Sequence, residues 1–203
     1  MKQPLPAFDL SAAQSERLQG FAALLLDWNR RINLISRSDA PRLWQRHILD
    51  SAQLAPLLPS PAGTLIDFGS GAGFPGLVLA AVTGWCAHLV EADGRKAAFL
   101  REAARLLGAD AVIHTTRAER LGGITAQAVT ARAFAPLTHL LPLAVHRLAE
   151  DGVCLFPKGQ SASDELTAAR REWHMRVECF QSRTSPAATV LRLHDLRPAS
   201  ASG

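Results

Sequence analysis

The stretch that decides the fold is Leu65-Ile66-Asp67-Phe68-Gly69-Ser70-Gly71-Ala72-Gly73-Phe74-Pro75-Gly76-Leu77-Val78-Leu79-Ala80. A short apolar run leads into three glycines at alternate positions, and an apolar helical pattern follows. Glycine has no Cβ atom and adopts positive φ without steric cost, so a ligand can approach the backbone of such a turn closely. The pattern therefore predicts a strand, a tight turn and a helix whose first N–H groups face a nucleotide-like cofactor.

Two kinds of cofactor fit this turn. Residues 71–76 satisfy G-x-G-x-x-G, the dinucleotide fingerprint, and Glu91 stands where an acid would accept hydrogen bonds from ribose hydroxyls. Asp67 favours S-adenosylmethionine instead, because an acid at the strand's end can meet a cationic amino-acid group but would repel a pyrophosphate. A nicotinamide-dependent oxidoreductase remains an alternative, as does a turn that serves only tight strand–helix packing.

Length and composition favour one cytoplasmic domain with a sizeable core. The chain has 203 residues, of which 48% are hydrophobic. No apolar run approaches the roughly 20 residues of a membrane span, and residues 1–9 have neither the apolar core nor the cleavage site of a signal peptide. Three widely spaced cysteines indicate buried thiols, and none has a neighbour that would make it a metal ligand. Lysine and arginine exceed aspartate and glutamate by 22 − 18 = 4, which is compatible with RNA.

From Thr64 onward, short apolar runs alternate with helical patterns, which predicts a parallel sheet with helices on both faces. We expect strands at residues 65–68, 87–91, 111–114, 128–131 and 153–156, helices at 76–83, 96–107, 137–150 and 164–173, and a final antiparallel pair at 176–181 and 188–194. Before Thr64 we expect a frayed lead at 1–10, helices at 12–28 and 38–54, and a linker at 57–63. The predicted domains are a helical cap and linker at 1–63, the main α/β domain at 64–197 and a disordered tail at 198–203.

The chemistry-bearing residues follow the ends of the predicted strands. In an open α/β sheet, ligands bind beyond the carboxyl ends of the strands, so Asp67, Glu91, Glu119 and Arg132 should converge. Glu119 can flank an adenine, although a solvated charge or a helix cap would explain it as well. Arg132 can hold a cofactor carboxylate or orient a substrate base.

Several short motifs resemble one known family. They are Trp28-Asn29, Asn33-Leu34, Arg46-His47-Ile48-Leu49-Asp50-Ser51, residues 67–76, Arg117-Ala118-Glu119, Ala131-Arg132-Ala133-Phe134-Ala135 and Lys158-Gly159. Together they resemble the bacterial small-subunit ribosomal RNA methyltransferase G family, also called the glucose-inhibited division protein B family. The resemblance extends from about residue 18 to residue 193.

This resemblance implies a class I S-adenosylmethionine-dependent methyltransferase fold, Rossmann-like, with seven strands of which the last is antiparallel. It implies cofactor contacts at Gly69, Phe74, Ala118, Glu119 and Arg132. With the residues of the turn and the strand ends, the expected cofactor-binding set is Asp67, Gly69, Gly71, Gly73, Phe74, Glu91, Ala118, Glu119 and Arg132. The chain departs from the family pattern before the fourth strand, where residues 126–128 carry no acid, and at Asp93.

The implied reaction is methylation of guanine N7 in 16S ribosomal RNA, with the small ribosomal subunit as partner. N7 has a free lone pair, so no proton must be removed and no acid or base catalyst is expected. We expect Arg132 and Lys158 to orient the substrate and Arg31, Arg46, His47 and Lys158 to bind RNA. We expect neither a metal nor a membrane, and a monomer.

Some alternatives remain open at this stage. Trp28 and Trp44 lie at helical spacing among leucines and are expected in the core rather than in stacking on bases. His47 and Asp50 share one helix face and bind substrate, bind each other across the helix, or anchor their helix to the main domain. A small-molecule methyltransferase and a non-catalytic cofactor-binding module that docks on RNA are the remaining alternatives for the whole protein.

Overall fold

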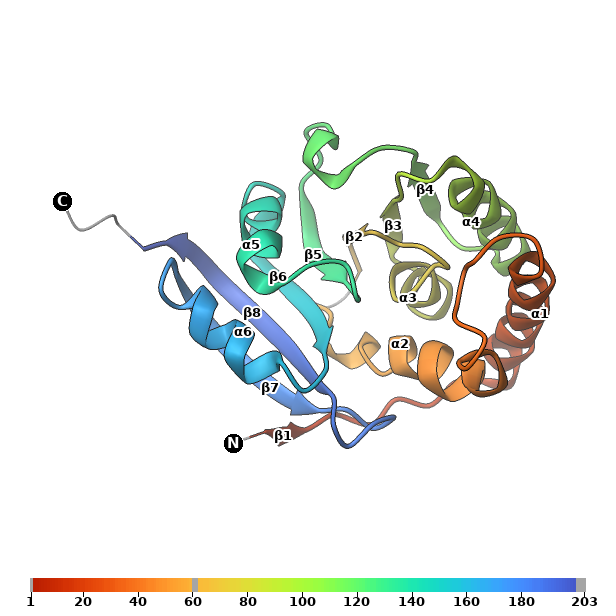
Figure 1. Cartoon of the computed structure of the whole chain (residues 1–203), viewed down its shortest axis with the longest axis horizontal. Helices are drawn as coiled ribbons and strands as arrows, with labels where there is room; N and C mark the ends of the chain where they lie inside the picture. Colours follow the sequence, from red (N-terminus) through yellow and green to blue (C-terminus); the bar gives the residue numbers. More distant parts are fainter. Residues whose placement is uncertain (1, 60–61, 200–203) are drawn as a thin grey trace.

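A computed structural model describes residues 2–59 and 62–199, which form an α/β fold around one mixed sheet (Figure 1). The strands follow the order β1-β7-β8-β6-β5-β2-β3-β4. Their bounds are β1 Gln3–Pro4, β2 Thr64–Phe68, β3 Cys86–Val90, β4 Ala111–His114, β5 Ala126–Ala131, β6 Leu148–Lys158, β7 Trp173–Gln181 and β8 Thr189–Pro198. β8 runs antiparallel to both of its neighbours, and the other neighbouring strands are parallel.

The helices form a layer on each face of the sheet. Their bounds are α1 Ala12–Asn29, α2 Asp50–Ala52, α3 Gly76–Thr83, α4 Gly94–Leu107, α5 Leu137–Val145 and α6 Ala162–Ala169, with the shorter turns η1 Ala40–Arg42, η2 Trp44–Leu49, η3 Ala55–Leu57 and η4 Ala118–Arg120. Figure 1 shows α1 and α4 side by side at one end and α5 and α6 beside β6 and β8 at the other. Ser11 begins α1 with the predicted capping box.

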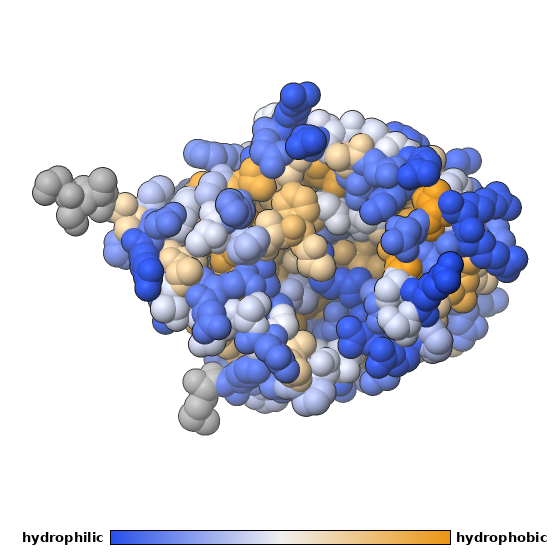
Figure 2. All heavy atoms as spheres, in the orientation of Figure 1, coloured by the Kyte–Doolittle hydropathy of each residue, from blue (hydrophilic) through white to orange (hydrophobic). Residues whose placement is uncertain are grey.

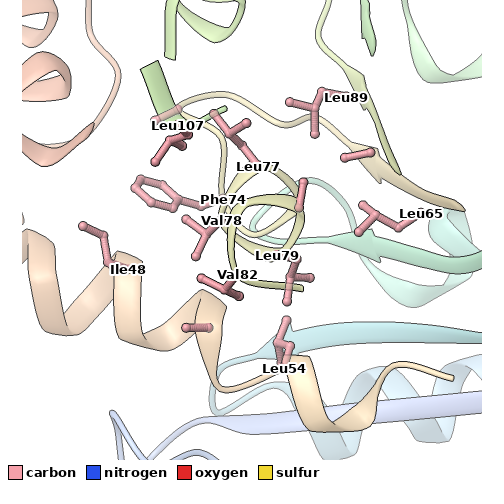
Figure 3. Packing of buried hydrophobic residues seen from close by; sticks show 14 of the residues in the cluster. Ile48, Leu54, Leu65, Phe74, Leu77, Val78, Leu79, Val82, Leu89 and Leu107 are labelled. Carbon is pink, nitrogen blue, oxygen red and sulfur yellow. The ribbon is translucent and has the colours of Figure 1, made fainter. Parts of the chain in front are cut away.

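The central strands are buried on both faces, which is why they read as continuous apolar runs. Leu65 of β2 packs in one hydrophobic cluster with α1, α3 and α4, whereas Ile66 packs in a second cluster with α5 and α6. Figure 3 shows Leu77, Val78, Leu79 and Val82 of α3 directed outward around their helix, toward neighbours such as Leu54 and Leu107. The N-terminal helices belong to the first cluster, so residues before Thr64 and the main sheet share one core.

Gly76 lets α3 approach β2 closely. A Cβ atom at this position would lie 2.5 Å from Cβ of Asp67, a distance that side chains do not tolerate. The fourth glycine of the motif therefore serves strand–helix packing, the role that the last glycine of such a fingerprint has in doubly wound folds.

The N-terminal lead is ordered in part, contrary to the frayed lead that the sequence predicts. Gln3 and Pro4 pair with Phe180 and Gln181 of β7 and add an eighth strand to the expected seven. An edge strand offers unpaired backbone groups, so even two residues can be held there. At the other terminus, Pro198 ends β8 and Ala199 donates a backbone hydrogen bond to Glu172, so the expected disordered tail begins too early; residues 200–203 lie outside the described residues.

Three predicted helices also differ. The predicted helix at 38–54 is a succession of 3-10, π and α turns, in which residues 44–49 form the π segment. The predicted helix at 137–150 ends at Val145, because the residues from Leu148 onward pair with β5 through an irregular register. The predicted helix at 164–173 ends at Ala169, because Trp173 pairs with Pro198 at the start of β7. In each case pairing or packing outweighs local propensity.

Of the three cysteines, only Cys154 is buried; Cys86 and Cys179 are half-buried, contrary to the expectation for all three. Among residues 2–59 and 62–199, no helix combines the length and the apolar character needed to cross a membrane.

Candidate active site

A cavity of about 900 Å³ opens beyond the carboxyl ends of the parallel strands. It is lined by parts of five segments: the N-terminal region between residues 34 and 50, the glycine turn at 69–74, the residues 132–136 after β5, the residues 157–165 from the end of β6 into α6, and the residues 182–190 from the loop after β7 into the start of β8. Segments far apart in sequence thus meet where an open α/β sheet places its ligands. Figure 2 shows apolar surface near the middle of the face drawn, with hydrophilic surface around it.

The glycine turn joins β2 to α3 in the conformation that its sequence requires. Gly69, Gly71 and Gly73 have φ values of +66°, +53° and +89°. Ser70 donates its N–H to Val90 at 3.0 Å, which ties the turn to β3. A Cβ atom at Gly71 would meet nothing closer than 3.7 Å, so this backbone is accessible to a ligand.

The expected cofactor-binding residues fall into two groups. Gly69, Gly71, Phe74 and Arg132 line the cavity, whereas Asp67, Gly73, Glu91, Ala118 and Glu119 do not. Glu91 nevertheless lies beside the turn, since its Oε2 accepts from the backbone N of Gly71 at 2.9 Å and its Oε1 from the N of Asp93 at 2.8 Å.

The turn η4 places Ala118 inside the protein and leaves Glu119 exposed. Arg147 fixes this turn, donating from Nη2 to the carbonyls of Ala118 at 3.2 Å and Leu121 at 3.0 Å. Its guanidinium also lies 5.9 Å from the ring centroid of Phe68. Sequence reasoning missed Arg147, because it lies 29 residues from Ala118 in a segment that was expected to be helical.

Asp67 is fully buried beneath the glycine turn rather than at the cavity surface. Its Oδ1 accepts a hydrogen bond from Thr130 at 2.7 Å, and its Oδ2 has no hydrogen-bond partner. Burial raises the pKa of this carboxyl to about 6, against the lowering effect of its hydrogen bonds. The expected contact of Asp67 with a cationic cofactor group is therefore not available in this arrangement.

Arg132 is the centre of a polar network at the end of β5. Its Nη2 lies 2.6 Å from Nδ1 of His47, and its Nη1 donates to the carbonyl of Arg46 at 3.0 Å and approaches Asp50 at 3.4 Å. The guanidinium also lies 5.0 Å from the ring centroid of Phe74, in the range of a cation–π contact. Arg132 thus joins the N-terminal region to the sheet and to the glycine turn.

The carboxylate of Asp50 extends this network to a third segment. Its Oδ1 accepts from Thr184 Oγ1 at 2.5 Å and from Gln53 Nε2 at 2.8 Å. Asp50 and His47 therefore anchor their helical segment to the main domain, which is one of the alternatives that the sequence leaves open. His47 lies in the π turn between Trp44 and Leu49 and Asp50 directly follows it, and both residues contact Arg132.

His47 is held neutral by its surroundings. Burial is the largest cause that lowers its pKa to about 4, and the neighbouring Arg132 acts in the same direction, whereas Asp39 and Asp50 oppose the shift. Because a guanidinium only donates, Nδ1 of His47 accepts and the proton resides on Nε2. The ring stacks on Phe74 at a centroid distance of 5.0 Å, which adds an apolar contact to the network.

Lys158 does not present a free ammonium group to the cavity. Its Nζ lies 2.8 Å from Oε2 of Glu165 and donates to the carbonyl of Ala135 at 2.8 Å. Glu165 also accepts from the backbone N of Leu137 at 3.0 Å. Lys158 and Glu165 together fix the segment that follows β5.

The other expected RNA-binding residues lie nearer the surface. Arg46 lines the cavity and pairs with Asp39 at 3.2 Å. Arg31 is 76% exposed, pairs with Asp27 at 3.7 Å and does not line the cavity.

The two tryptophans pack against the hydrophobic core, as expected. Trp28 lies 5.8 Å from the ring centroid of Phe99 and donates to Glu102, and Trp44 packs against the first hydrophobic cluster. Neither lines the cavity, so neither is placed to stack on a substrate there.

Solved structures share this architecture. The ribosomal protein L11 methylase of Lactobacillus delbrueckii subsp. bulgaricus aligns with a TM-score of 0.58 at 18% identity, covering 70% of this chain and 77% of that chain. TYW2 of M. jannaschii, solved in complex with AdoMet, aligns with a TM-score of 0.56 at 14% identity, covering 75% of this chain and 76% of that chain. The fold is that of the class I S-adenosylmethionine-dependent methyltransferases.

Sequence comparison narrows the class to one family. The family model described as "rRNA small subunit methyltransferase G" (GidB) matches residues 14–188. A relative from Rhodospirillum centenum named "Ribosomal RNA small subunit methyltransferase G" is 54% identical over 192 residues, covering 95% of this chain and 89% of its own length. The chain belongs to the rRNA small subunit methyltransferase G family.

Proposed function

We propose that this protein transfers a methyl group from S-adenosylmethionine to N7 of a guanine in 16S ribosomal RNA. The observation that carries the proposal is the contact between the two segments by which the sequence resembles this family most specifically. Residues 46–51 and 131–135 meet at the cavity through Arg132 and His47, at 2.6 Å. The family-specific residues are therefore gathered where the fold places its substrates.

The residues at the glycine turn fit the cofactor. The accessible backbone of Gly71 suits a close approach, Glu91 places a carboxylate beside it for ribose hydroxyls, and Arg132 lines the cavity with a cation for the amino-acid carboxylate. S-adenosylmethionine supplies, when bound, a methyl group on a positively charged sulfur. Phe74 stacks on His47 and lies beneath Arg132. We propose that its ring forms an apolar wall of the cavity next to the glycine turn.

The charged groups at the cavity favour a reaction that needs no base. Asp39 pairs with Arg46, Asp50 accepts from Thr184 and Gln53, and Glu165 pairs with Lys158. His47 uses its Nδ1 lone pair toward Arg132. Each acid and the histidine at the cavity is thus engaged by a protein group, which suits guanine N7, whose lone pair is already free.

The chain would accelerate the reaction by holding N7 in line with the methyl group. Alignment of two bound reactants contributes about 7–11 kcal/mol in favourable intramolecular cases. Arg132 remains charged at neutral pH and lies where it can stabilise negative charge on the base or on a phosphate. Arg46 and Arg31 add positive charge on the N-terminal side and are proposed to contact the RNA backbone.

We further propose that the protein acts as a monomer on the small ribosomal subunit in the cytoplasm. The formal net charge of +4 suits an RNA partner.

The experiment is transfer of a labelled methyl group from S-adenosylmethionine to ribosomal RNA from cells that lack this modification. Deproteinised 16S RNA and intact small subunits are compared side by side, and 23S RNA serves as the control substrate. We expect label in 16S RNA alone, and the better of the two substrates shows whether ribosomal proteins present the target. Cofactor binding without transfer to any RNA would contradict the proposal and favour a small-molecule enzyme or a non-catalytic module.

A further inference from the structure

Phe134 is an unusual residue on this surface. Its side chain is 40% exposed, and among the large exposed hydrophobic residues of the described chain, which are Leu26, Leu106, Val112 and Phe134, it alone lines the candidate cavity. Aromatic side chains of this size dominate protein cores, so a phenylalanine exposed in a site requires an explanation.

The backbone that presents this ring is strained. Ala133 has a φ of +52°, a left-handed conformation that residues with a Cβ atom rarely adopt. Such strain persists only where the surrounding structure enforces it, and it gathers at functional sites. Here it turns the chain immediately before Phe134.

The segment after Phe134 is fixed by the Lys158 and Glu165 pair. Lys158 holds the carbonyl of Ala135 at 2.8 Å, and Glu165 holds the N–H of Leu137 at 3.0 Å. On the other side, Arg132 is bound to His47. The chain on both sides of Phe134 is therefore held by these contacts, although the phenyl ring itself remains exposed.

One part of the ring is covered by the protein. The ring lies 6.4 Å from the ring centroid of Phe68 at an interplanar angle of 29°, and a Cβ atom added at Gly69 would lie 2.3 Å from its Cδ2. The glycine turn thus leaves room for the phenyl ring beside the cofactor-binding backbone. The exposed part of the ring belongs to the cavity wall.

We propose that Phe134 is the surface on which the target purine stacks, and that Lys158 and Glu165 are positioning residues that hold Phe134 in place. This inference rests on the proposed function, because N7 is inaccessible in A-form RNA and the target base must leave its stack to be methylated. An exposed aromatic ring replaces the lost stacking without selecting a particular base. Lys158 acts through Phe134, since its ammonium is already paired.

The test compares Phe134→Ala, Phe134→Leu and Phe134→Trp with Leu106→Ala, which removes a similarly exposed apolar side chain outside this cavity. Steady-state methylation of deproteinised, unmodified 16S RNA, affinity for the same RNA at saturating S-adenosylhomocysteine, and affinity for S-adenosylmethionine are measured for each. We expect Phe134→Ala to lower kcat/KM and RNA affinity by about 5- to 150-fold, the range that loss of one base–aromatic stack gives. Phe134→Trp and Leu106→Ala should remain close to wild type, and cofactor affinity should not change.

Three results would overturn the stacking proposal. If Phe134→Ala keeps RNA affinity and kcat/KM near the wild-type values, the ring does not stack on the base. If Phe134→Leu is as active as wild type, an apolar side chain of any shape is sufficient and no aromatic stack is needed. Loss of cofactor affinity in Phe134→Ala assigns the ring to the cofactor pocket. A wild-type protein that binds the RNA but methylates it neither free nor in intact small subunits contradicts the proposed function alone, and the RNA affinities still decide the stacking.

The positioning role is tested by a double-mutant cycle. We expect Lys158→Gln and Glu165→Gln each to lower kcat/KM for RNA. In the double variant Phe134→Ala/Lys158→Gln, kcat/KM should be within about twofold of that of Phe134→Ala, because both changes remove the same interaction. Independent, multiplying effects of Phe134→Ala and Lys158→Gln would show that Lys158 contacts RNA itself. Glu165→Gln keeps an oxygen for Leu137, so it serves as the milder variant if Lys158→Gln destabilises the fold.

Discussion

Nη2 of Arg132 lies 2.6 Å from Nδ1 of His47, although 85 positions separate the two residues in the sequence. The contact requires a neutral imidazole, because a protonated ring has no lone pair to accept from a guanidinium. The connection between the N-terminal region and the sheet therefore depends on the protonation state of His47.

Protonation of His47 should destabilise the protein at mildly acidic pH. Its pKa is about 4 in the folded state and 6.5 in the unfolded chain, so its stabilising contribution is complete above pH 6.5 and is lost as the pH falls toward 4. We expect a loss of about 2 kcal/mol between pH 7 and pH 5 that His47→Gln does not show. Urea unfolding of both proteins at the two pH values measures it, and parallel losses would contradict the assignment.

Deprotonation of Asp67 should destabilise the protein as the pH rises, opposite to the effect of His47. Its pKa is raised from 3.8 to about 6, so the folded state binds the proton more tightly and stability is lost as the pH rises through this window. We expect Asp67→Asn to gain about 1 kcal/mol relative to wild type when the pH changes from 5 to 7. The amide keeps an oxygen for Thr130. Urea titrations at the two pH values test this, and a relative loss at pH 7 would show that the charged form is stabilised.

Replacement of Arg132 by lysine should weaken cofactor binding despite the conserved charge. Lysine lacks the planar fork that reaches His47, Asp50 and the carbonyl of Arg46 together. We expect S-adenosylmethionine affinity to fall by about 10- to 150-fold, the value of one charge-assisted hydrogen bond. Calorimetry measures it, with the exposed Arg171→Lys as control. If the cofactor affinity is unchanged and the KM for RNA is raised, Arg132 binds the RNA substrate rather than the cofactor.

Substitution of Gly69 and of Gly108 by alanine separates the effect of backbone strain on stability from an effect on methyl transfer at the candidate site. Both glycines have positive φ, +66° and +59°, so each substitution should cost about 1–2 kcal/mol of stability. Only the Cβ at Gly69 collides with Phe134, whereas the space at Gly108 is open. We expect Gly69→Ala alone to lose methyl transfer, by more than about tenfold. Equal activities of the two variants, measured on folded protein at low temperature, would contradict a role for Gly69 in the site.

Much of the fold follows from the sequence because its signals are local. The alternation of apolar runs and helical patterns predicted β2 to β5 in place and the central part of β6, and the glycine turn at residues 69–73 adopts the positive φ values that its composition requires. The sequence pattern also predicted the final antiparallel pair, which β7 and β8 form. The short β1 was not foreseeable, because Gln3 and Pro4 are strand residues only through pairing with β7.

The site was predicted less completely than the fold. The sequence indicated that strand ends converge, which follows from topology, and it named Arg132 and His47 separately. It gave no sign that these two side chains bind each other, that Lys158 is neutralised by Glu165, or that Asp67 is sealed beneath α3. Such contacts arise from packing between distant segments. The positive φ of Ala133, which presents Phe134, likewise has no signature in the local sequence, since alanine does not favour this conformation.

The most direct test of the account is the identity of the methylated nucleoside. Unmodified 16S RNA is incubated with the protein and labelled S-adenosylmethionine and digested to nucleosides, and a second sample is treated with borohydride and aniline, which cleave the chain at 7-methylguanosine. We predict label in 7-methylguanosine alone and cleavage at one position. Label in any other nucleoside, or the absence of cleavage in RNA that carries label, would contradict methylation at guanine N7.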